Sequence, residues 1–196
     1  MTSILERWNI TVDELTELID ANPSLRGMML GYVAELQLRK LLVVFPEIRY
    51  LGKGDDHDRS SKGDCLIEYK GKQFRVEAKS LQTNSIKHTN GIHFGKANVD
   101  ASDKRAVSLP DGSRIETTCL LRGGFDMLAV NCFAFEEQWR FVFAANADLP
   151  STSGKKYSEY QRQHLLATLV PVTCPPEPPF YDSPIPVLDV LLEQSR

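Results

Sequence analysis

The sequence predicts an α/β fold in which a mixed central β-sheet is flanked by α-helices, with a proline-rich extension at the C-terminal end. Three observations support this prediction. Helix start signals precede long helical patterns within residues 11–43. Alternating apolar and polar residues on both sides of a Lys-Gly turn at 70–71 predict a β-hairpin. Two strongly apolar runs, 125–135 and 139–144, are typical of strands covered on both faces.

Two helices are predicted before the hairpin. Residues 11–14 form a capping box, because the Thr11 hydroxyl can accept a backbone amide while Glu14 reaches back, and this helix should extend to about residue 20. Asn22 and Pro23 repeat the start signal, since Asn suits the N-cap and Pro the first helical position. The second helix should continue to about residue 43 and end before the proline at 46. A first strand is expected at 45–51.

The hairpin brings two carboxylates together. Counting back from a two-residue loop along strands expected at 64–69 and 73–79 places Asp64 directly opposite Glu77. Residues paired in this way have Cβ atoms roughly 4.5 to 5.5 Å apart, and like charges there repel unless positive charge lies between them. A divalent cation would remove that repulsion. Alternation puts Lys79 on the side of Glu77, so Asp64, Glu77 and Lys79 form one polar face.

These residues resemble a known motif. Gly63-Asp64, followed after twelve residues by Glu77-Ala78-Lys79, resembles the PD-(D/E)xK motif of the restriction-endonuclease-like nucleases, with Gly63 in the place of the proline. The pattern is short, but its placement on a hairpin with a helix before it makes it more specific. The resemblance covers most of residues 28–150, is strongest to type II restriction endonucleases, and implies a restriction-endonuclease-like core.

The resemblance also implies a chemistry, the Mg²⁺-dependent hydrolysis of phosphodiester bonds in double-stranded DNA, with Mn²⁺ able to substitute. Asp64, Glu77 and the backbone carbonyl of Ala78 would hold the metal, because Mg²⁺ prefers oxygen ligands. Lys79 would orient or deprotonate the attacking water and neutralise charge on the phosphorus. Asp64, Glu77 and Lys79 are thus the expected catalytic residues. The alternative is an ordinary exposed hairpin that happens to contain Glu-Ala-Lys.

Glu35 is a further candidate metal ligand. On the second predicted helix it lies between Met28, Leu38 and Leu42 rather than on a polar stripe, and an isolated carboxylate in such surroundings is costly unless paired or bound to metal. Nucleases of the resembling family often bring an acidic residue to the metal from the helix before the hairpin. The alternative is an ion pair with Arg39 at i+4.

A DNA-recognition insertion is expected at 83–118, because a long segment without clear periodicity in a compact domain is usually functional or disordered. Its Asn, Lys and Arg side chains are of the types that contact bases and phosphates. Between residues 70 and 96, six Lys and Arg residues stand against one acidic residue, a basic patch in a chain of net charge −3. The expected DNA contacts are Lys62, Gln82, Asn84, Lys87, His88, Lys96, Lys104 and Arg105. A histidine-metal nuclease built on His88 and His93 is disfavoured, since its motif spacing is missing.

Two further acidic features have other interpretations. The polar loop before the hairpin contains Asp55, Asp56, His57 and Asp58 without the spacing of a calcium loop, which favours a flexible loop on the DNA-facing side. In a different hairpin register, Asp58 would take the place of the motif aspartate. Asp126, at the head of an apolar run, is expected to form structural hydrogen bonds.

The C-terminal part is expected to end as an arm. A helix is predicted at 158–168, and residues 171–186 contain seven prolines, which favours an extended strap over helix or regular strand. Residues 188–192 can anchor the end of the strap on this subunit or on a partner. The expected organisation is therefore a nuclease domain at 1–170 and a proline-rich C-terminal arm at 171–196.

Composition bounds the class of protein. The chain has no apolar run of membrane-spanning length and does not begin with a basic region followed by an apolar one, so we expect a cytoplasmic protein without a membrane partner. Nothing in the sequence indicates a nucleotide cofactor. The cysteines at 65, 119, 132 and 174 lack metal-site spacing and are expected to be free thiols, mostly buried, in a reducing compartment.

Three functions remain open. The first is a sequence-specific type II restriction endonuclease, expected to be a homodimer because a duplex cut needs two active sites or two passes. The second is a structure-selective nuclease, such as a Holliday-junction resolvase or a recombination or repair nuclease, which reads DNA shape with the same motif. The third is a DNA-binding module that has lost activity. The long polar segment after the motif favours the first function, and the intact Asp64, Glu77 and Lys79 disfavour the third.

Overall fold

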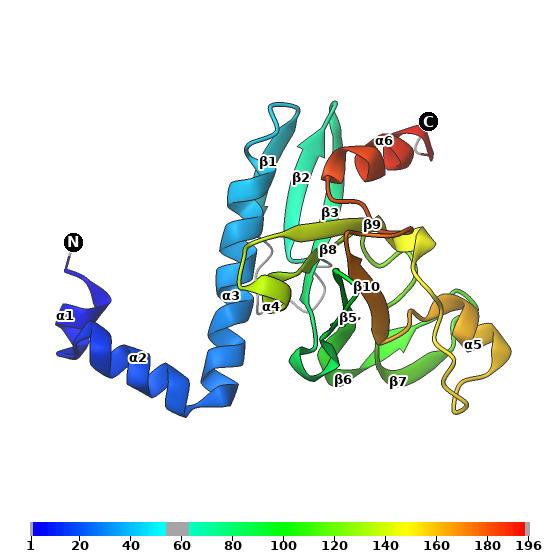
Figure 1. The fold of residues 1–196 in the computed structure, drawn as a ribbon. Coiled ribbons are helices and arrows are strands. Elements are labelled where there is room, and N and C mark those ends of the chain that lie inside the picture. Colours follow the sequence, from blue (N-terminus) through cyan, green and yellow to red (C-terminus); the bar gives the residue numbers. More distant parts are fainter. Residues whose placement is uncertain (1, 54–62, 195–196) are drawn as a thin grey trace.

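The computed structural model describes residues 2–53 and 63–194, so Lys62 and the acidic loop at 55–58 lie outside the described residues. Figure 1 shows a body of sheets and helices from which a helical arm projects at the N-terminal end. The helices are α1 (Ile4–Trp8), α2 (Val12–Ala21), α3 (Pro23–Leu42), α4 (Phe133–Glu136), α5 (Glu159–His164) and α6 (Pro184–Gln194), with 3-10 helices at Thr83–Ser85 and Asn146–Asp148. The strands are β1 (Ile48–Lys53), β2 (Cys65–Tyr69), β3 (Lys72–Ser80), β4 (Lys87–Thr89), β5 (Ile92–Asn98), β6 (Asp100–Ser108), β7 (Arg114–Cys119), β8 (Met127–Asn131), β9 (Phe141–Ala145) and β10 (Leu169–Cys174).

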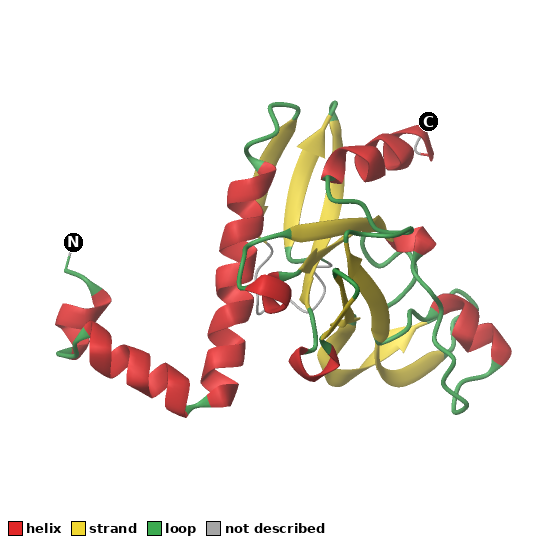
Figure 2. Ribbon diagram, in the orientation of Figure 1, coloured by secondary structure: helices red, strands yellow, loops and turns green. Residues whose placement is uncertain are grey.

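The central sheet is mixed, as predicted. It has the strand order β1-β2-β3-β8-β9, in which β3 and β8 are parallel and the other neighbours are antiparallel. Figure 2 shows helices flanking this sheet and a second group of strands packed below it. That second group contains a three-stranded sheet, β10-β5-β4, and the two-stranded ribbon β6-β7. The predicted α/β class is confirmed.

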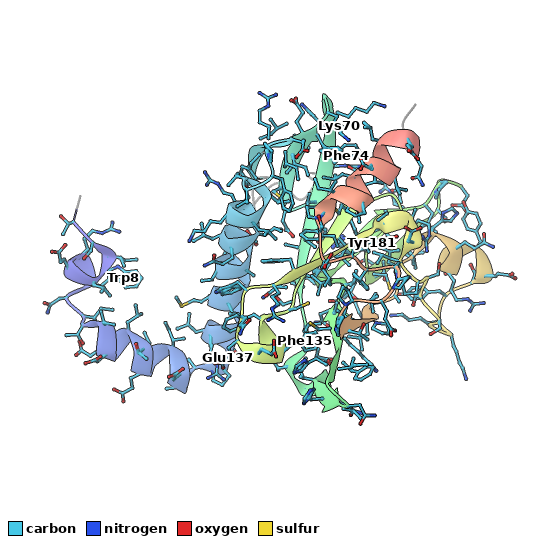
Figure 3. The ribbon with its side chains drawn as sticks, turned by 45° about the horizontal axis from the view of Figure 1, so that its top comes forward. Trp8, Lys70, Phe74, Phe135, Glu137 and Tyr181 are labelled. Atoms are coloured by element: carbon cyan, nitrogen blue, oxygen red, sulfur yellow. The ribbon has the colours of Figure 1, made fainter. Side chains whose placement is uncertain are left out.

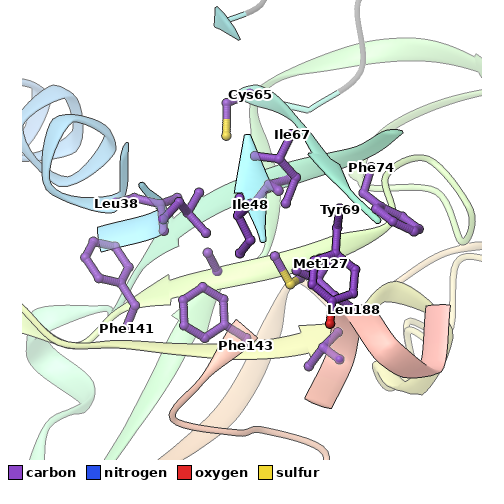
Figure 4. Packing of buried hydrophobic residues seen from close by; sticks show 14 of the residues in the cluster. Leu38, Ile48, Cys65, Ile67, Tyr69, Phe74, Met127, Phe141, Phe143 and Leu188 are labelled. Atoms are coloured by element: carbon purple, nitrogen blue, oxygen red, sulfur yellow. The ribbon is translucent and has the colours of Figure 1, made fainter. Parts of the chain in front are cut away.

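Two hydrophobic clusters cover the two faces of the central sheet. On one face, Leu38 and Leu42 of α3 and Leu188 of α6 pack with alternate residues of the strands, among them Met127 and Phe143 (Figure 4). On the other face, residues of β5 and β10 pack with the residues of β8 and β9 whose side chains point the other way, such as Leu128 and Val142. Both β8 and β9 are buried along their whole length, which is the pattern expected of strands covered on both faces.

The N-terminal start signals are confirmed in part. Thr11 and Glu14 form the predicted capping box at the start of α2, and Pro23 is the first residue of α3. The expected Asn22 cap is wrong, because its side-chain amide instead donates a hydrogen bond of 2.7 Å to the Leu18 carbonyl at the end of α2. The α2 helix thus uses Asn22 as a C-terminal cap, and the proline alone marks the start of α3.

The predicted hairpin is confirmed in its register. Tyr69 pairs with Lys72, so Lys70 and Gly71 form the two-residue loop, and both have positive φ values of 48° and 81°. Positive φ at both loop positions is typical of the turn whose twist matches that of the flanking strands. The turn is held to the C-terminal helix, since Asp189 of α6 accepts hydrogen bonds from the Tyr69 hydroxyl at 2.8 Å and the Lys70 ammonium at 2.7 Å.

The segment predicted to lack regular structure is instead built of strands. Residues 83–118 contain β4, β5, β6 and almost all of β7, arranged as two antiparallel hairpins. Asn90-Gly91, with φ values of 53° and 76°, makes the first turn, and a turn around Asp111-Gly112 makes the second. An Asn-Gly pair between two strands is a strong hairpin signal, and it marks β4 and β5 in the sequence.

Two other expected elements differ. The run at 125–135 ends as a strand at Asn131 and continues as the short helix α4, where the Asn131 side chain accepts the Phe133 amide at 2.9 Å. The helix expected at 158–168 is capped by Ser158 as a helix start requires, but α5 ends at His164. Leu165 and Leu166 then form isolated bridges to other segments, which take over their backbone pairing.

The proline-rich segment contains both a strand and a helix, so the expectation that it excludes them is wrong. Strand β10 pairs with β5 along its whole length, and Pro171 is accommodated because β10 is an edge strand, whose outer side needs no amide partner. Helix α6 begins at Pro184, where a missing amide costs nothing. The predicted anchor at 188–192 is confirmed on this subunit, since Leu188 is fully buried.

None of the helices in the described part of the chain combines the length and apolar character needed to cross a lipid bilayer. Of the cysteines, Cys65, Cys119 and Cys132 are buried and Cys174 is partly buried, which agrees with the expected burial of most of these thiols. Asp126 has the expected structural role, because its carboxylate accepts the Arg75 backbone amide at 2.6 Å and lies beside the Arg75 guanidinium.

Candidate active site

Asp64 lies at the end of the β2–β3 hairpin, directly before β2. Its backbone amide donates to the carbonyl of Val76, the residue that pairs with Cys65, at 2.8 Å. The pairing of β2 with β3 ends at Cys65–Val76, so Asp64 lies just beyond the last ladder pair, beside Val76 and Ala78. The Asp64 carboxylate accepts the Ala78 backbone amide at 2.7 Å, so it takes the place that a further residue of β2 would occupy. A hydrogen bond to a strand amide fixes this carboxylate near the plane of the sheet.

The backbone conformation at Gly63 does not suit a proline, the residue that the resembling motif has at this position. Gly63 has a φ of +86°, whereas a proline ring holds φ near −65°. A Cβ atom at this position would also lie 3.2 Å from both the Arg75 Cβ and the Val76 carbonyl oxygen. The chain thus turns into β2 along a path that favours glycine and brings the Asp64 side chain onto β3.

Glu77 and Lys79 form a tight pair on β3. The Lys79 ammonium lies 2.8 Å from the Glu77 carboxylate, and the two side chains are only 20% and 12% exposed. Alternation along the strand directs both to the face opposite that of Ala78, which packs with the cluster beneath α3. The in-plane Asp64 carboxylate therefore lies between this pair and the α3 side of the sheet.

A cavity of about 220 Å³ opens on the α3 side, and it contains the predicted Glu35. Its lining includes Glu35, Asp64, Ala78, Lys53 and Tyr50. The Glu35 carboxylate pairs with the Lys53 ammonium at 2.7 Å, and the Lys53 ammonium also lies 4.8 Å from the centre of the Tyr32 ring. The partner expected from helical spacing, Arg39, lies over the ring of Tyr50 instead, 5.1 Å from its centre. The structure thus brings Glu35 to the same cavity as Asp64.

The electrostatics of the site follow from burial and crowding of charge. Burial and the neighbouring Glu77 carboxylate raise the pKa of Asp64 to about 6, against an ordinary value of 3.8, although Lys79 and the Ala78 amide act in the opposite direction. Burial acts to lower the pKa of Lys79, but the carboxylates of Glu77 and Asp64 outweigh it, so that pKa is raised. The negative charge of these two carboxylates is compensated only partly by one lysine. Such an arrangement is energetically unfavourable for a purely structural site.

The site offers oxygen donors of the kind that a Mg²⁺ ion would need. Asp64 and Glu77 offer carboxylate oxygens, and the Ala78 carbonyl points to the same edge of β3 as its amide, where Asp64 lies. Within residues 2–53 and 63–194, no group of three His, Cys, Asp or Glu side chains is arranged to hold a metal ion. A metal here would accordingly combine two carboxylates, a backbone carbonyl and water rather than a cage of side chains.

Most of the predicted DNA contacts lie on the strands that follow the site. Gln82 lies two residues after the end of β3, and its backbone amide donates to the Lys96 carbonyl of β5 at 2.8 Å. Exposed side chains are found at the positions of Asn84, Lys87, His88, Lys96 and Lys104, whereas Arg105 is partly buried. His88 and His93 are cross-strand partners with ring centres 4.3 Å apart. Lys62 lies outside the described residues.

Two charged residues near the site were not identified from the sequence. Lys53 is the last residue of β1, and only the pairing of β1 with β2 brings it to Glu35. Asp100, at the start of β6, has a pKa raised by burial, and Lys79 is close enough to oppose that effect. The sequence carries no local pattern for either residue, because both contacts join segments far apart in the chain.

No protein-family model and no curated protein matches this chain. Among solved structures it is similar to that of a bacterial homing endonuclease, I-Ssp6803I, with a TM-score of 0.38 and 14% sequence identity over 69% of this chain and 85% of that one. At this identity and TM-score the likeness does not bear on function.

Proposed function

We propose that this protein is a Mg²⁺-dependent endonuclease that hydrolyses phosphodiester bonds in double-stranded DNA. The observation that carries the proposal is the position of the Asp64 carboxylate, which is held by the Ala78 amide beside the largely covered Glu77–Lys79 pair. This is the juxtaposition that the PD-(D/E)xK resemblance implies for Asp64, Glu77, Ala78 and Lys79. An ordinary exposed hairpin would leave the three charged side chains in water.

The residues fit a hard divalent cation. Asp64, Glu77 and the Ala78 carbonyl would hold Mg²⁺, with Mn²⁺ as a substitute, and Glu35 is the fourth candidate from the adjoining cavity. When bound, the metal supplies Lewis-acid stabilisation of the phosphate and lowers the pKa of an attacking water. Neutralising the Asp64 and Glu77 charges would also remove the repulsion that the site carries without metal.

The burial and pairing of Lys79 support its proposed role as the catalytic ammonium group. It is mostly buried and held by Glu77, so its charge is directed into the site rather than into solvent. An ammonium in a site of restricted water access stabilises charge that develops on a phosphate more strongly than one in bulk water. It can also orient the attacking water, which an exposed lysine on a flexible side chain would not do.

The surrounding strands favour sequence recognition of the type II restriction kind. The hairpins β4–β5 and β6–β7 follow β3 directly and expose Lys87, His88, Lys96 and Lys104, side chains suited to phosphates and base edges. Such ribbons are among the elements that enter DNA grooves. A homodimer would then present two active sites to the two strands of a palindromic sequence.

Cleavage assays with two substrates test the proposal. The purified protein is incubated with plasmid DNA and with a branched DNA junction in Mg²⁺, in Mn²⁺, in Ca²⁺ and with chelator. Discrete plasmid fragments in Mg²⁺ or Mn²⁺ but not with chelator are expected. Cleavage confined to the branched substrate would indicate a structure-selective nuclease, and DNA binding without cleavage in Mg²⁺ would indicate an inactive module.

The variant Lys79→Ala should abolish cleavage while DNA binding in Ca²⁺, measured by fluorescence anisotropy, stays close to that of the wild type. The matched control is Lys155→Ala, which removes an exposed lysine from the turn before α5 and should leave cleavage intact. A Lys79→Ala protein that still cuts at near the wild-type rate would show that this ammonium is not catalytic.

A further inference from the structure

The three-stranded sheet β10-β5-β4 has one face in the core and one face in solvent. Along β5, Gly95 and Ala97 are buried, whereas Phe94 and Lys96 are exposed. The residues of β10 that pair with Gly95 and Ala97 are buried as well. Phe135 of α4, labelled in Figure 3, packs on the buried side, because a Cβ atom on Gly95 would lie only 3.0 Å from its ring. The side that carries Phe94 and Lys96 is open to ligands, and we call it the outer face.

Phe94 presents an aromatic ring beside two lysines on the outer face. Phe94 is 41% exposed, and Lys87 and Lys96 are exposed too. Lys87 is its partner on β4, about 4.8 Å away across the sheet, and Lys96 follows two residues later on β5, about 6.7 Å away along the strand. Residues that pair directly, or that lie two apart in one strand, project from the same face of a sheet. The ring and the two ammonium groups are therefore presented to solvent together.

The charge of these strands favours a polyanion. Strands β4, β5 and β10 contain no Asp or Glu, and their Lys and Arg residues are Lys87 and Lys96. Two cations without acidic neighbours in the same sheet attract phosphates. A single exposed apolar side chain is ordinary on a protein surface, so the exposure of Phe94 alone has little meaning. An aromatic ring combined with lysines, however, is the combination that holds the bases and phosphates of a nucleic acid strand.

Thr173 places an unused hydrogen-bonding group next to Phe94. The two residues are direct partners across β10 and β5. The Thr173 hydroxyl is buried and has no hydrogen-bond partner among the described residues. A polar group in this state is destabilising, and a ligand that supplies the missing partner removes that cost. Hydroxyl groups of this type are regular donors to phosphate oxygens in complexes with nucleic acids.

The outer face continues the side of β3 that lines the cavity of the candidate active site. Beyond β3 the chain pairs with β5 through the Leu81–Ala97 bridge and the hydrogen bond from the Gln82 amide to the Lys96 carbonyl. Alternation puts Leu81 on the buried side with Ala97, and it puts Gln82 and Lys96 on the side of Ala78, which lines the cavity. The four residues from Ala78 to Gln82 span about 13 Å, the rise of about four nucleotides along a DNA helix. A DNA strand that follows this side of the chain reaches the outer face a few nucleotides from the cavity.

We propose that Phe94 stacks on a base of the bound DNA while Lys87 and Lys96 hold the phosphates on either side. The inference rests on the proposed function, since it takes DNA as the ligand, and it specifies a substrate that is unstacked at one base step near the site of cleavage. Insertion of an apolar side chain at a base step kinks the duplex. The energy needed for unstacking is lowest where a base is mismatched or unpaired. The outer face should therefore prefer DNA that is already distorted at one position.

DNA binding measured by fluorescence anisotropy in Ca²⁺ tests the proposal. The probes are a short labelled duplex of mixed sequence and the same duplex with one unpaired adenine at its centre. The wild type should bind the duplex with the unpaired base more tightly. Phe94→Ala should weaken that binding by about 5- to 100-fold, which corresponds to one lost stack between a base and an aromatic ring. The slope of the logarithm of affinity against the logarithm of salt concentration should stay unchanged, because the ring carries no charge.

Two further variants separate stacking from a general change of the surface. Phe94→Trp keeps an aromatic face and should bind as tightly as the wild type. Leu169→Ala removes another exposed apolar side chain of the outer face, one that lies opposite Asn98 rather than a lysine, and should leave binding unchanged. Phe94 is not part of the core clusters, so its variants should fold, which far-ultraviolet circular dichroism checks.

Three results would overturn the role of Phe94: wild-type affinity in Phe94→Ala, a loss of affinity with a smaller salt slope, or an equal loss in Leu169→Ala. Because binding is measured without cleavage, the two proposals fail separately. A protein that binds DNA through Phe94 but does not cut it would contradict the nuclease activity alone. A protein that cuts DNA, and whose Phe94→Ala variant binds as the wild type does, would contradict the stacking alone.

Discussion

Replacing Asp64 with asparagine should make the metal-free protein more stable at pH 8. In the folded protein the pKa of Asp64 is raised to about 6, whereas the ordinary value is 3.8. The folded state therefore binds this proton more tightly than the unfolded chain, and the charged carboxylate opposes folding. The free-energy penalty for the charged carboxylate is absent well below pH 4, grows as the pH rises between the two pKa values, and is fully present above about pH 7.

The difference between the two pKa values corresponds to about 3 kcal/mol at pH 8. Asparagine keeps an oxygen that can accept the Ala78 amide, so the substitution removes the charge without orphaning that donor. The asparagine amide remains a partly buried polar group beside Glu77, and the expected gain in the free energy of unfolding is therefore about 1 to 3 kcal/mol.

Urea unfolding with chelator present, at pH 8 and at pH 4, measures this gain. The control is Asp103→Asn, an exposed aspartate of β6, which should leave the stability nearly unchanged. Adding Mg²⁺ at pH 8 should stabilise the wild type and have a smaller effect on Asp64→Asn, because a ligand that binds only the folded state stabilises it. A variant that is less stable than the wild type at pH 8, or equally stabilised at both pH values, would refute the electrostatic account of the site.

Three further predictions concern the path of the chain and the strands around the site. Gly63→Ala should destabilise the protein by at least about 1 kcal/mol, because φ at this residue is +86° and the new Cβ would lie 3.2 Å from the Val76 carbonyl oxygen. A neutral effect on the free energy of unfolding in urea would contradict the described turn. Leu188→Ala should lower the free energy of unfolding by about 2 to 5 kcal/mol, because the side chain is fully buried. Val190→Ala, on the exposed side of α6, should lower it far less. Equal effects of the two substitutions would mean that α6 is not anchored as described. Lys87→Ala and Lys104→Ala should each lower the slope of the logarithm of DNA affinity against the logarithm of salt concentration by about 1, and an unchanged slope would remove that lysine from the DNA contacts.

The central hairpin was predictable because its determinants are local. A two-residue loop at Lys70-Gly71 and the period of two along each strand fix which residues of β2 and β3 face each other, so the pairs from Tyr69–Lys72 to Cys65–Val76 follow by counting. The start of α2 was predictable for the same reason, since Thr11 and Glu14 are three residues apart. In both cases the side chains that decide the structure belong to the segment itself.

Other parts of the site depend on neighbours that are remote in the sequence. Lys53, rather than Arg39, pairs with Glu35 because β1 lies beside β2, and helical spacing carries no information about that strand. Strand β10 forms despite Pro171 because it lies at an edge, where β5 pairs with one side only. Proline composition alone predicted an extended strap, because it carries no information about the partner strand. That strand lies some 75 residues earlier in the chain, between Ile92 and Asn98.

The strands β2 and β3 and the common side of Glu77 and Lys79 can be predicted from the sequence, because turn chemistry and alternation act between residues that are close along the chain. Three features required the packed structure: the hydrogen bond from the Ala78 amide to Asp64, the approach of Glu35 to the same cavity, and the absence of any buried residue between 2 and 33. These features depend on how β1, α3 and the body pack, and packing is settled by the whole set of buried side chains rather than by any one segment.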